Sequence, residues 1–240
     1  MFFMGVTKNE FLYLLILNFT QVTAKTRMKI VQLIFILMTI VFSSNGQVLY
    51  GTQAPNGSPE GNQFLIQANY KFSRQDYLGA IQDYNKAVEL APNDAYGYNN
   101  RGLARYELQD YIGAIQDYTK FIDLESNDAI GYRNRALAKY ALQDYLGSID
   151  DYTVFIEILP DDALGYSCRA LPKLKLQDYA GAIADYNKAI ELAPQDPDGY
   201  YNRAMAKILA GDTKGECIDL KKAAELGHEE AAEKIKTECN

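Results

Sequence analysis

The sequence predicts an all-α fold, a right-handed solenoid of about five helix-turn-helix units of 34 residues with a C-terminal capping helix. The first observation is a period, because the tripeptide Gln-Asp-Tyr recurs every 34 residues. It begins at Gln75, Gln109, Gln143 and Gln177. The second is that three more series keep the same step: Tyr84, Tyr118, Tyr152 and Tyr186; Tyr98, Tyr132, Tyr166 and Tyr200; Arg101, Arg135, Arg169 and Arg203. Four series in phase are not a chance pattern.

The first 46 residues differ from the repeats. Two apolar runs, Phe11 to Phe19 and Ile30 to Phe42, are each shorter than the roughly 20 residues of a membrane-spanning helix. A basic start at Met28, the second apolar run and small or polar residues up to Gly46 have the order of a secretory signal peptide. We therefore predict that residues 1–46 are an N-terminal extension and a signal-like segment whose working start is Met28. The alternative is an uncleaved membrane anchor at residues 30–42.

Residues 47–60 are rich in Gly, Pro, Asn and Ser and predict a flexible linker. The repeat domain is expected to cover residues 61–240. Its predicted divisions are the units 61–94, 95–128, 129–162, 163–196 and 197–227, followed by the cap 228–240.

Each unit shows two helical patterns separated by a break. In the unit 95–128, Tyr98, Arg101 and Arg105 share one helical face, and a second apolar face begins at Tyr111. Small residues recur in the middle of both helices, which allows two helix axes to approach closely. Prolines such as Pro92 end the units, because proline has no N–H with which to continue a helix.

These residues resemble the tetratricopeptide repeat family. Tyr98 stands at the family's Trp position, Gly102 at its Gly, Ala114 at its Ala and Tyr118 at its Phe. The resemblance covers residues from about 61 to 226, although Ser126 replaces the unit-ending Pro and the fifth unit departs further. It implies a stack whose first helices line a concave groove used for protein–protein interaction.

Composition argues against several classes of function. Lys and Arg number 24 against 31 Asp and Glu, a net charge of −7, which disfavours nucleic-acid binding. The chain has one histidine, His228, and three cysteines, so a His-rich metal site or a catalytic triad is not expected. We predict no catalytic residues, cofactor, metal or small-molecule substrate. The membrane is expected as a partner only through an uncleaved N-terminal segment.

The candidate partner-binding residues lie on the free side of the first helices. They combine aromatic and aliphatic side chains with amides, which bond both the N–H and the C=O of an extended peptide. The predicted set is Tyr96, Asn99, Asn100, Leu103, Tyr106, Arg133, Asn134, Leu137, Tyr140, Leu171, Lys175, Tyr201 and Asn202. The alternative for Leu103, Leu137 and Leu171 is that they complete the packing between adjacent first helices.

Two further patterns have a structural interpretation. The arginine series is matched by Asp83, Asp117, Asp151, Asp185 and Asp219 on the second helices, and matched series of opposite charge are expected to pair the two helices. The lysines with which family members clamp the carboxylate end of chaperones are not evident, because Leu65, Asn99, Ile130 and Leu164 occupy the relevant places. Chaperone-tail binding is therefore disfavoured.

Cys217 and Cys239 lie at nearly equal distances from the turn at Gly227 and His228. In an antiparallel helix hairpin such residues stand level, so a disulfide is expected between them, with Cys168 as the odd thiol. The alternative is that all three cysteines are reduced. A disulfide agrees with export to the periplasm or cell envelope.

The function predicted from the sequence is a non-catalytic scaffold that binds an extended peptide or a partner protein in the concave groove. The alternative is a membrane-anchored accessory or assembly subunit of a cell-envelope complex. The mass of the mature N-terminus separates the two, because a chain that begins at Gln47 favours the scaffold.

Overall fold

The computed structural model describes residues 41–42, 48–49 and 59–239. Two short strands, β1 (Val41–Phe42) and β2 (Val48–Leu49), form an antiparallel pair. The helices are α3 (Pro59–Ser73), α4 (Tyr77–Leu90), α5 (Ala95–Glu107), α6 (Tyr111–Leu124), α7 (Ala129–Ala141), α8 (Tyr145–Ile158), α9 (Ala163–Lys175), α10 (Tyr179–Leu192), α11 (Pro197–Ala210), α12 (Thr213–Glu225) and α13 (Glu229–Glu238). The predicted signal segment lies outside the described residues except for β1.

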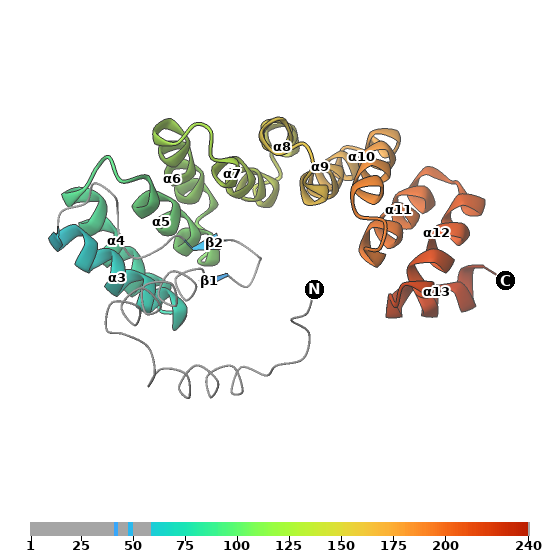
Figure 1. Cartoon of the computed structure of the whole chain (residues 1–240), viewed down its shortest axis with the longest axis horizontal. Coiled ribbons are helices and arrows are strands. Elements are labelled where there is room, and N and C mark those ends of the chain that lie inside the picture. The colour runs from blue at the N-terminus through green and yellow to red at the C-terminus, as the bar shows by residue number, and fades with distance from the viewer. Residues whose placement is uncertain (1–40, 43–47, 50–58, 240) are drawn as a thin grey trace, which may run out of the picture.

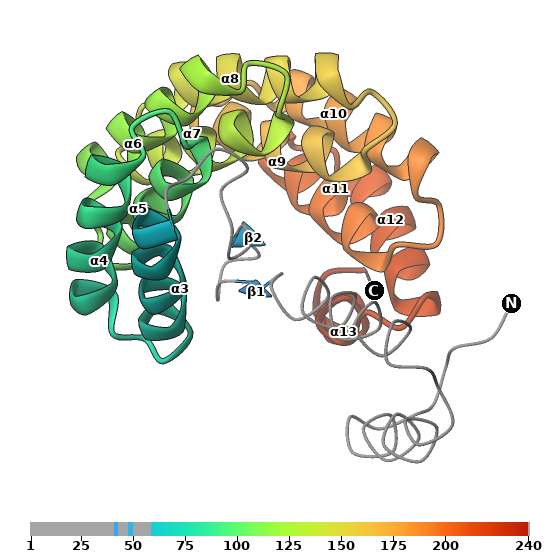
Figure 2. The ribbon, with the colours of Figure 1, turned by 60° about the vertical axis from the view of Figure 1, so that its left-hand side comes forward.

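The helices stack in five consecutive pairs, as the period predicts. Each first helix packs on the second helix of its own unit, and each second helix packs on the first helix of the next unit. Helix α13 packs on α12 and covers the end of the stack. The stack bends into an arc from α3 to α13 (Figures 1 and 2). The predicted α-solenoid with its capping helix is therefore confirmed.

Helix α3 begins at Pro59, inside the segment that was expected to be linker, so the predicted boundary at residue 61 is two residues late. Proline is favoured at the first position of a helix, because its missing N–H would have no intrahelical partner there. The proline that was interpreted as a linker residue starts the helix.

An Asp side chain caps the N-terminus of each helix from α4 to α12. The Asp110 Oδ1 atom accepts a hydrogen bond of 3.0 Å from the Gly113 backbone N–H at the start of α6. A Cβ atom at Gly113 would lie 2.2 Å from Asp110 Oδ2, which explains glycine at this position. In the turn before Asp110, Gln109 has a φ of 62°. Gly211, at the equivalent position of the fifth unit, has a φ of 80°. The repeated Gln-Asp of the sequence is thus a helix stop followed by a helix start.

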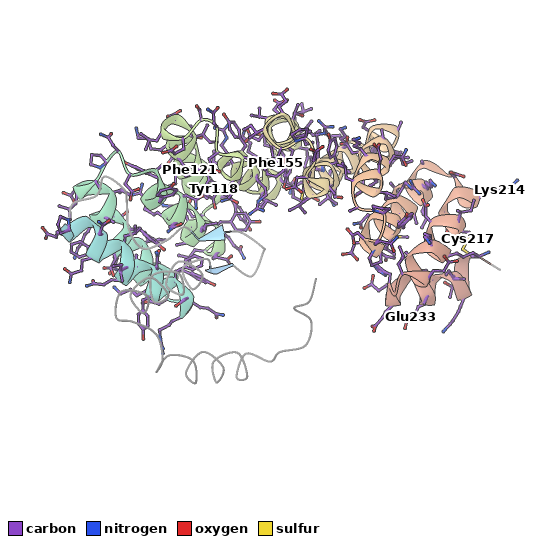
Figure 3. All side chains as sticks on the ribbon, viewed as in Figure 1. Tyr118, Phe121, Phe155, Lys214, Cys217 and Glu233 are labelled. Carbon is purple, nitrogen blue, oxygen red and sulfur yellow. A yellow bond between two sulfur atoms is a disulfide. The ribbon has the colours of Figure 1, made fainter. Side chains whose placement is uncertain are left out.

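Tyrosines from the second helices fill the space between the paired helices. Tyr118 is fully buried, and a Cβ atom at Gly102 would lie 2.8 Å from its Cε1 atom. Phe121, labelled with Tyr118 in Figure 3, instead packs toward the next unit, because a Cβ atom at Gly131 on α7 would lie 2.5 Å from its Cδ1 atom. The equivalent tyrosines, which are Tyr84, Tyr152 and Tyr186, are buried in the same way. The tyrosine content of the sequence is therefore largely repeat packing.

The arginine and aspartate series pair within each unit from the second to the fifth. The Nη2–Oδ1 distances are 2.6 Å for Arg101–Asp117, 2.7 Å for Arg135–Asp151, 2.8 Å for Arg169–Asp185 and 2.5 Å for Arg203–Asp219. In the first unit Lys71 Nζ lies 2.6 Å from Asp83. The structural interpretation of the arginine series is confirmed, because these guanidinium groups are engaged with buried carboxylates.

Pro172 lies inside α9 and is buried. It lacks the N–H that would bond the Cys168 carbonyl, and the equivalent positions in units two, three and five are Ala104, Ala138 and Ala206. We expect Pro172→Ala to raise the free energy of unfolding, by up to about 3 kcal/mol if no other contact compensates for the hydrogen bond that the proline removes. Urea unfolding followed by circular dichroism measures the change, and a loss of stability would show that the packing requires the ring.

Candidate functional site

The first helices line the inner side of the arc, and the second helices follow its outer side. Figure 2 shows α3, α5 and α9 toward the hollow and α4, α6, α8 and α10 along the outer rim. On α5, Gly102 and Arg101 contact the second helix, while Tyr96 and Leu103 fall on the opposite side of the helix. We call the surface formed by Tyr96, Leu103 and their equivalents in the other units the inner face. The full set is Asn62, Tyr96, Ile130, Leu164 and Asp198, with Asn69, Leu103, Leu137, Leu171 and Met205.

Four of the predicted partner-binding residues are fully buried, which corrects their assignment as exposed binding groups. They are Asn99, Asn100, Leu103 and Asn134. The amides bond one another across the unit boundaries: Asn134 Nδ2 donates to Asn99 Oδ1 at 3.0 Å, and Asn100 Nδ2 donates to Asn69 Oδ1 at 3.2 Å. Buried amides require such partners, so these side chains join units rather than offering open hydrogen-bonding groups.

The predicted aromatic residues are half-buried and contact other rings. Tyr106 meets Tyr111 edge to face with centroids 5.2 Å apart, and Tyr140 meets Tyr145 in the same way at 5.4 Å. Tyr201 stacks on His228 at 4.1 Å. Tyr96, the remaining predicted aromatic residue, lies 6.4 Å from Phe121. Each predicted tyrosine thus has a packing role inside the solenoid and exposes part of its surface.

The exposed part of the predicted set lies on α9. Leu171 is 42% exposed and Lys175 is exposed, whereas Arg133, Leu137 and Asn202 are half-buried. Leu164 lies on the same helix, one period after Ile130, and is 48% exposed. Leu164 and Leu171 give the inner face of unit four an exposed apolar surface.

Cys168 stands where units two, three and five have Asn100, Asn134 and Asn202. Burial raises the pKa of its thiol, and a hydrogen bond with the Tyr152 hydroxyl opposes that shift. A raised pKa keeps the sulfur as a thiol at neutral pH, and the thiolate is the nucleophilic form. Cys168 therefore has the environment of a packing residue.

The two remaining cysteines form a disulfide at the C-terminal end, where the sequence predicted one. The Cα atoms of Cys217 and Cys239 are 5.6 Å apart, and the bond joins α12 to the end of α13 (Figure 3). Glu216 lies beside the two cysteines, and its carboxylate is a third group of a kind that can bind a metal ion. Because the disulfide uses both sulfurs, this cluster offers a cation only the carboxylate.

Comparison with known proteins gives a consistent result. A family model described as TPR repeat matches residues 68–109 and 173–207, and one described as tetratricopeptide repeat matches residues 95–128. The matched segments are tetratricopeptide repeats, in agreement with the resemblance seen in the sequence. A comparison with curated protein sequences gives no match.

Solved structures share the fold at low sequence identity. A crystal structure of MamA superposes with a TM-score of 0.66 and 22% identity, over 72% of this chain and 94% of that one. MamA 41-end from Desulfovibrio magneticus RS-1 gives 0.67 and 17%, over 70% and 96%. YrrB, described as a TPR protein with an unusual peptide-binding site, gives 0.62 and 16%, over 72% and 90%. Within the residues that the structure describes, none of the helices has both the length and the apolar character needed to cross a membrane.

Proposed function

We propose that this chain is a non-catalytic scaffold that binds an extended segment of a partner protein on its inner face. The observation that carries the proposal is the exposure of Leu164 and Leu171 together on α9, a first helix that lies toward the hollow of the arc. Large apolar side chains that remain exposed in a rimmed surface are typical of interaction sites.

The shape and chemistry of the inner face favour an extended partner segment over a compact domain. Equivalent positions follow one another from unit to unit, so they form a line along the arc rather than a patch. Apolar side chains such as Leu171 are exposed on the first helices, which also carry half-buried polar groups such as Asn202. Such a line suits a peptide whose side chains contact the apolar positions and whose backbone meets polar groups. YrrB, a TPR protein with an unusual peptide-binding site, supports this proposal by analogy of fold.

We further propose that the scaffold acts outside the cytoplasm, in the periplasm or cell envelope. The support is the signal-like order of residues 28–46 and the disulfide between Cys217 and Cys239, because disulfides persist in oxidising compartments. The second candidate, an envelope assembly subunit anchored by residues 30–42, is supported only by the apolar character of that run. The mass of the mature N-terminus distinguishes the two.

The experiment that tests partner binding replaces the exposed leucines by Asp. We expect the double variant Leu164→Asp and Leu171→Asp to lose at least tenfold in partner recovery when the tagged chain is purified from its native envelope fraction, because each change places a charge in an apolar contact. The matched control is Leu146→Asp on α8, since Leu146 is 67% exposed on a second helix. Equal loss in both variants, or no loss in the first, would place the interface elsewhere. Circular dichroism verifies that both variants remain helical.

A further inference from the structure

Glu216, Cys217 and Cys239 form a cluster at the C-terminal end of the solenoid. Each offers an atom of a kind that binds metal ions, a carboxylate oxygen or a sulfur, and the three atoms all lie within 4.8 Å of one another. Glu216 and Cys217 belong to α12, and Cys239 follows the last residue of α13, so the cluster joins two helices (Figure 3). The disulfide uses both sulfurs in the oxidised chain, and reduction makes them available as ligands.

The cluster is a departure of the fifth unit from the repeat. One period earlier, the fourth unit has Ala182 at the position of Glu216 and Ile183 at the position of Cys217. Ala182 is fully buried, and Ile183 packs against the same core cluster. Glu216 is only 5% exposed, so the fifth unit holds a carboxylate where the fourth has apolar core. The packing of the repeat therefore does not account for these two side chains.

The positions of the three ligand atoms suit a zinc ion. Zn²⁺ binds thiolate sulfur at about 2.3 Å and carboxylate oxygen at about 2.0 to 2.2 Å, so the ligand atoms of a tetrahedral site lie roughly 3.5 to 4 Å apart. With the Cα atoms of Cys217 and Cys239 5.6 Å apart, small side-chain rotations reach these separations once the bond between the sulfurs is broken. Both cysteines are half-buried, so solvent can supply a water molecule as the fourth ligand.

Apolar contacts that do not involve the disulfide also hold the two helices together. Leu220 and Ala223 of α12 are buried in one cluster with Ala231 of α13, and Ile235 of α13 packs against it. These contacts keep α13 on α12 in the reduced chain. The ligands from the two helices thus start close to their bound positions, which lowers the entropic cost of binding a metal ion.

We propose that the reduced chain binds Zn²⁺ through Glu216, Cys217 and Cys239, and that formation of the disulfide closes this site. Two molecules of a thiol reductant convert the protein disulfide to two thiols and become a disulfide themselves, which is a two-electron exchange. Each protein thiol then releases its proton as its sulfur binds the metal. The carboxylate, held out of water at 5% exposure, is the third anionic ligand.

The consequence is that α12 and α13 are clamped in both redox states. The disulfide joins them in an oxidising compartment, and the zinc ion joins them in a reducing one. This inference goes beyond partner binding on the inner face and does not depend on it, because the cluster lies on α12 and α13 rather than on the exposed leucines of α9.

The test titrates the full chain with Zn²⁺ in competition with a chromophoric chelator. The chain is reduced with a water-soluble phosphine, since a thiol reductant would itself bind zinc. We expect the reduced wild type to bind one Zn²⁺ at least about 100-fold more tightly than the oxidised wild type, because oxidation removes two of the three protein ligands. Reduced Cys217→Ile, which restores the residue of the fourth unit, is expected to lose as much.

Glu216→Ala also restores the residue of the fourth unit, so it tests the carboxylate without placing a new side chain in the core. It is expected to weaken Zn²⁺ binding by at least about tenfold, since even the loss of an outer partner of a ligand costs that much. The matched control is Cys168→Ala, which removes the thiol outside the cluster and is expected to leave the affinity unchanged. Circular dichroism verifies that the variants remain helical.

Equal affinity of the reduced and oxidised chains would overturn the proposal, and so would full affinity in Cys217→Ile or in Glu216→Ala. Hydrogen exchange of the reduced wild type gives a second test. Added Zn²⁺ is expected to slow exchange in residues 213–238 toward the rates of the oxidised chain, because the metal joins the same two helices as the disulfide. Exchange that Zn²⁺ leaves unchanged in these residues would overturn the zinc clamp.

Discussion

Replacing Asp117 by Ala is expected to lower the free energy of unfolding by about 3 to 5 kcal/mol. The Asp117 side chain is 3% exposed and accepts from two cations of α5: Arg101 Nη2 at 2.6 Å and Arg105 Nη1 at 2.8 Å. Burial raises the pKa of this carboxyl, while Arg101 and Arg105 oppose the shift, so desolvation is the larger effect. Buried ion pairs add little net stability in general, but removing the Asp117 carboxylate leaves two guanidinium groups facing an uncharged cavity.

Urea unfolding at neutral pH, followed by circular dichroism, measures this effect. The matched control is Asp123→Ala, because Asp123 is an exposed acid on the same helix α6 and its loss is expected to change stability by less than about 0.5 kcal/mol. A loss below about 1 kcal/mol for Asp117→Ala would show that the guanidinium groups find other partners or water without cost, and that the charged series contributes little to holding paired helices together.

Removing the disulfide by Cys239→Ser is expected to destabilise the C-terminal end by about 3 kcal/mol, the loop-closure value for cysteines separated by 22 residues. The effect should be local, because the disulfide links the end of α13 to α12, the helix on which α13 packs. Hydrogen exchange is therefore expected to accelerate in residues 213–238 and to stay unchanged in α5 and α6.

Reduction of the wild type with dithiothreitol should reproduce the exchange pattern of Cys239→Ser, and reduction of the variant should add nothing. Non-reducing peptide mapping provides the direct check, since the expected product is a disulfide-linked peptide pair that contains Cys217 and Cys239 with Cys168 free. Free thiols at both Cys217 and Cys239 in protein isolated from its source cells would contradict the disulfide and weaken the proposal of export.

The fold was predictable from the sequence because its information is periodic. The step between Tyr84, Tyr118 and Tyr152 defines the unit, and small residues such as Ala114 mark where two helices meet. The matched charges of Arg101 and Asp117 predicted the ion pair that joins the two helices of the unit. Each of these signals is local to one unit or to adjacent units, which is how a solenoid is stabilised.

The candidate site was less predictable, because a period identifies which side of a helix a residue occupies but not what covers that side. Asn99 and Leu103 occupy the inner side of α5 as expected, yet both are fully buried. The cause for Asn99 is side-chain pairing across units, because Asn134 Nδ2 donates to Asn99 Oδ1 although the two residues are not equivalent positions of the repeat. Leu103 belongs to a buried cluster with Leu65 and Ala138 from the two adjacent units, and the period alone does not show which side chains those units supply.

The central claim is that the inner face of unit four contacts an extended segment of a partner protein. The most direct measurement places p-benzoylphenylalanine at position 171 or, as a matched control, at position 146, and maps the cross-linked peptides by mass spectrometry after photolysis in the source cells. The account predicts that position 171 cross-links to one short sequence stretch of a partner protein, while position 146 does not. Cross-links to that partner from position 146 alone, or from 171 to many unrelated stretches, would contradict it.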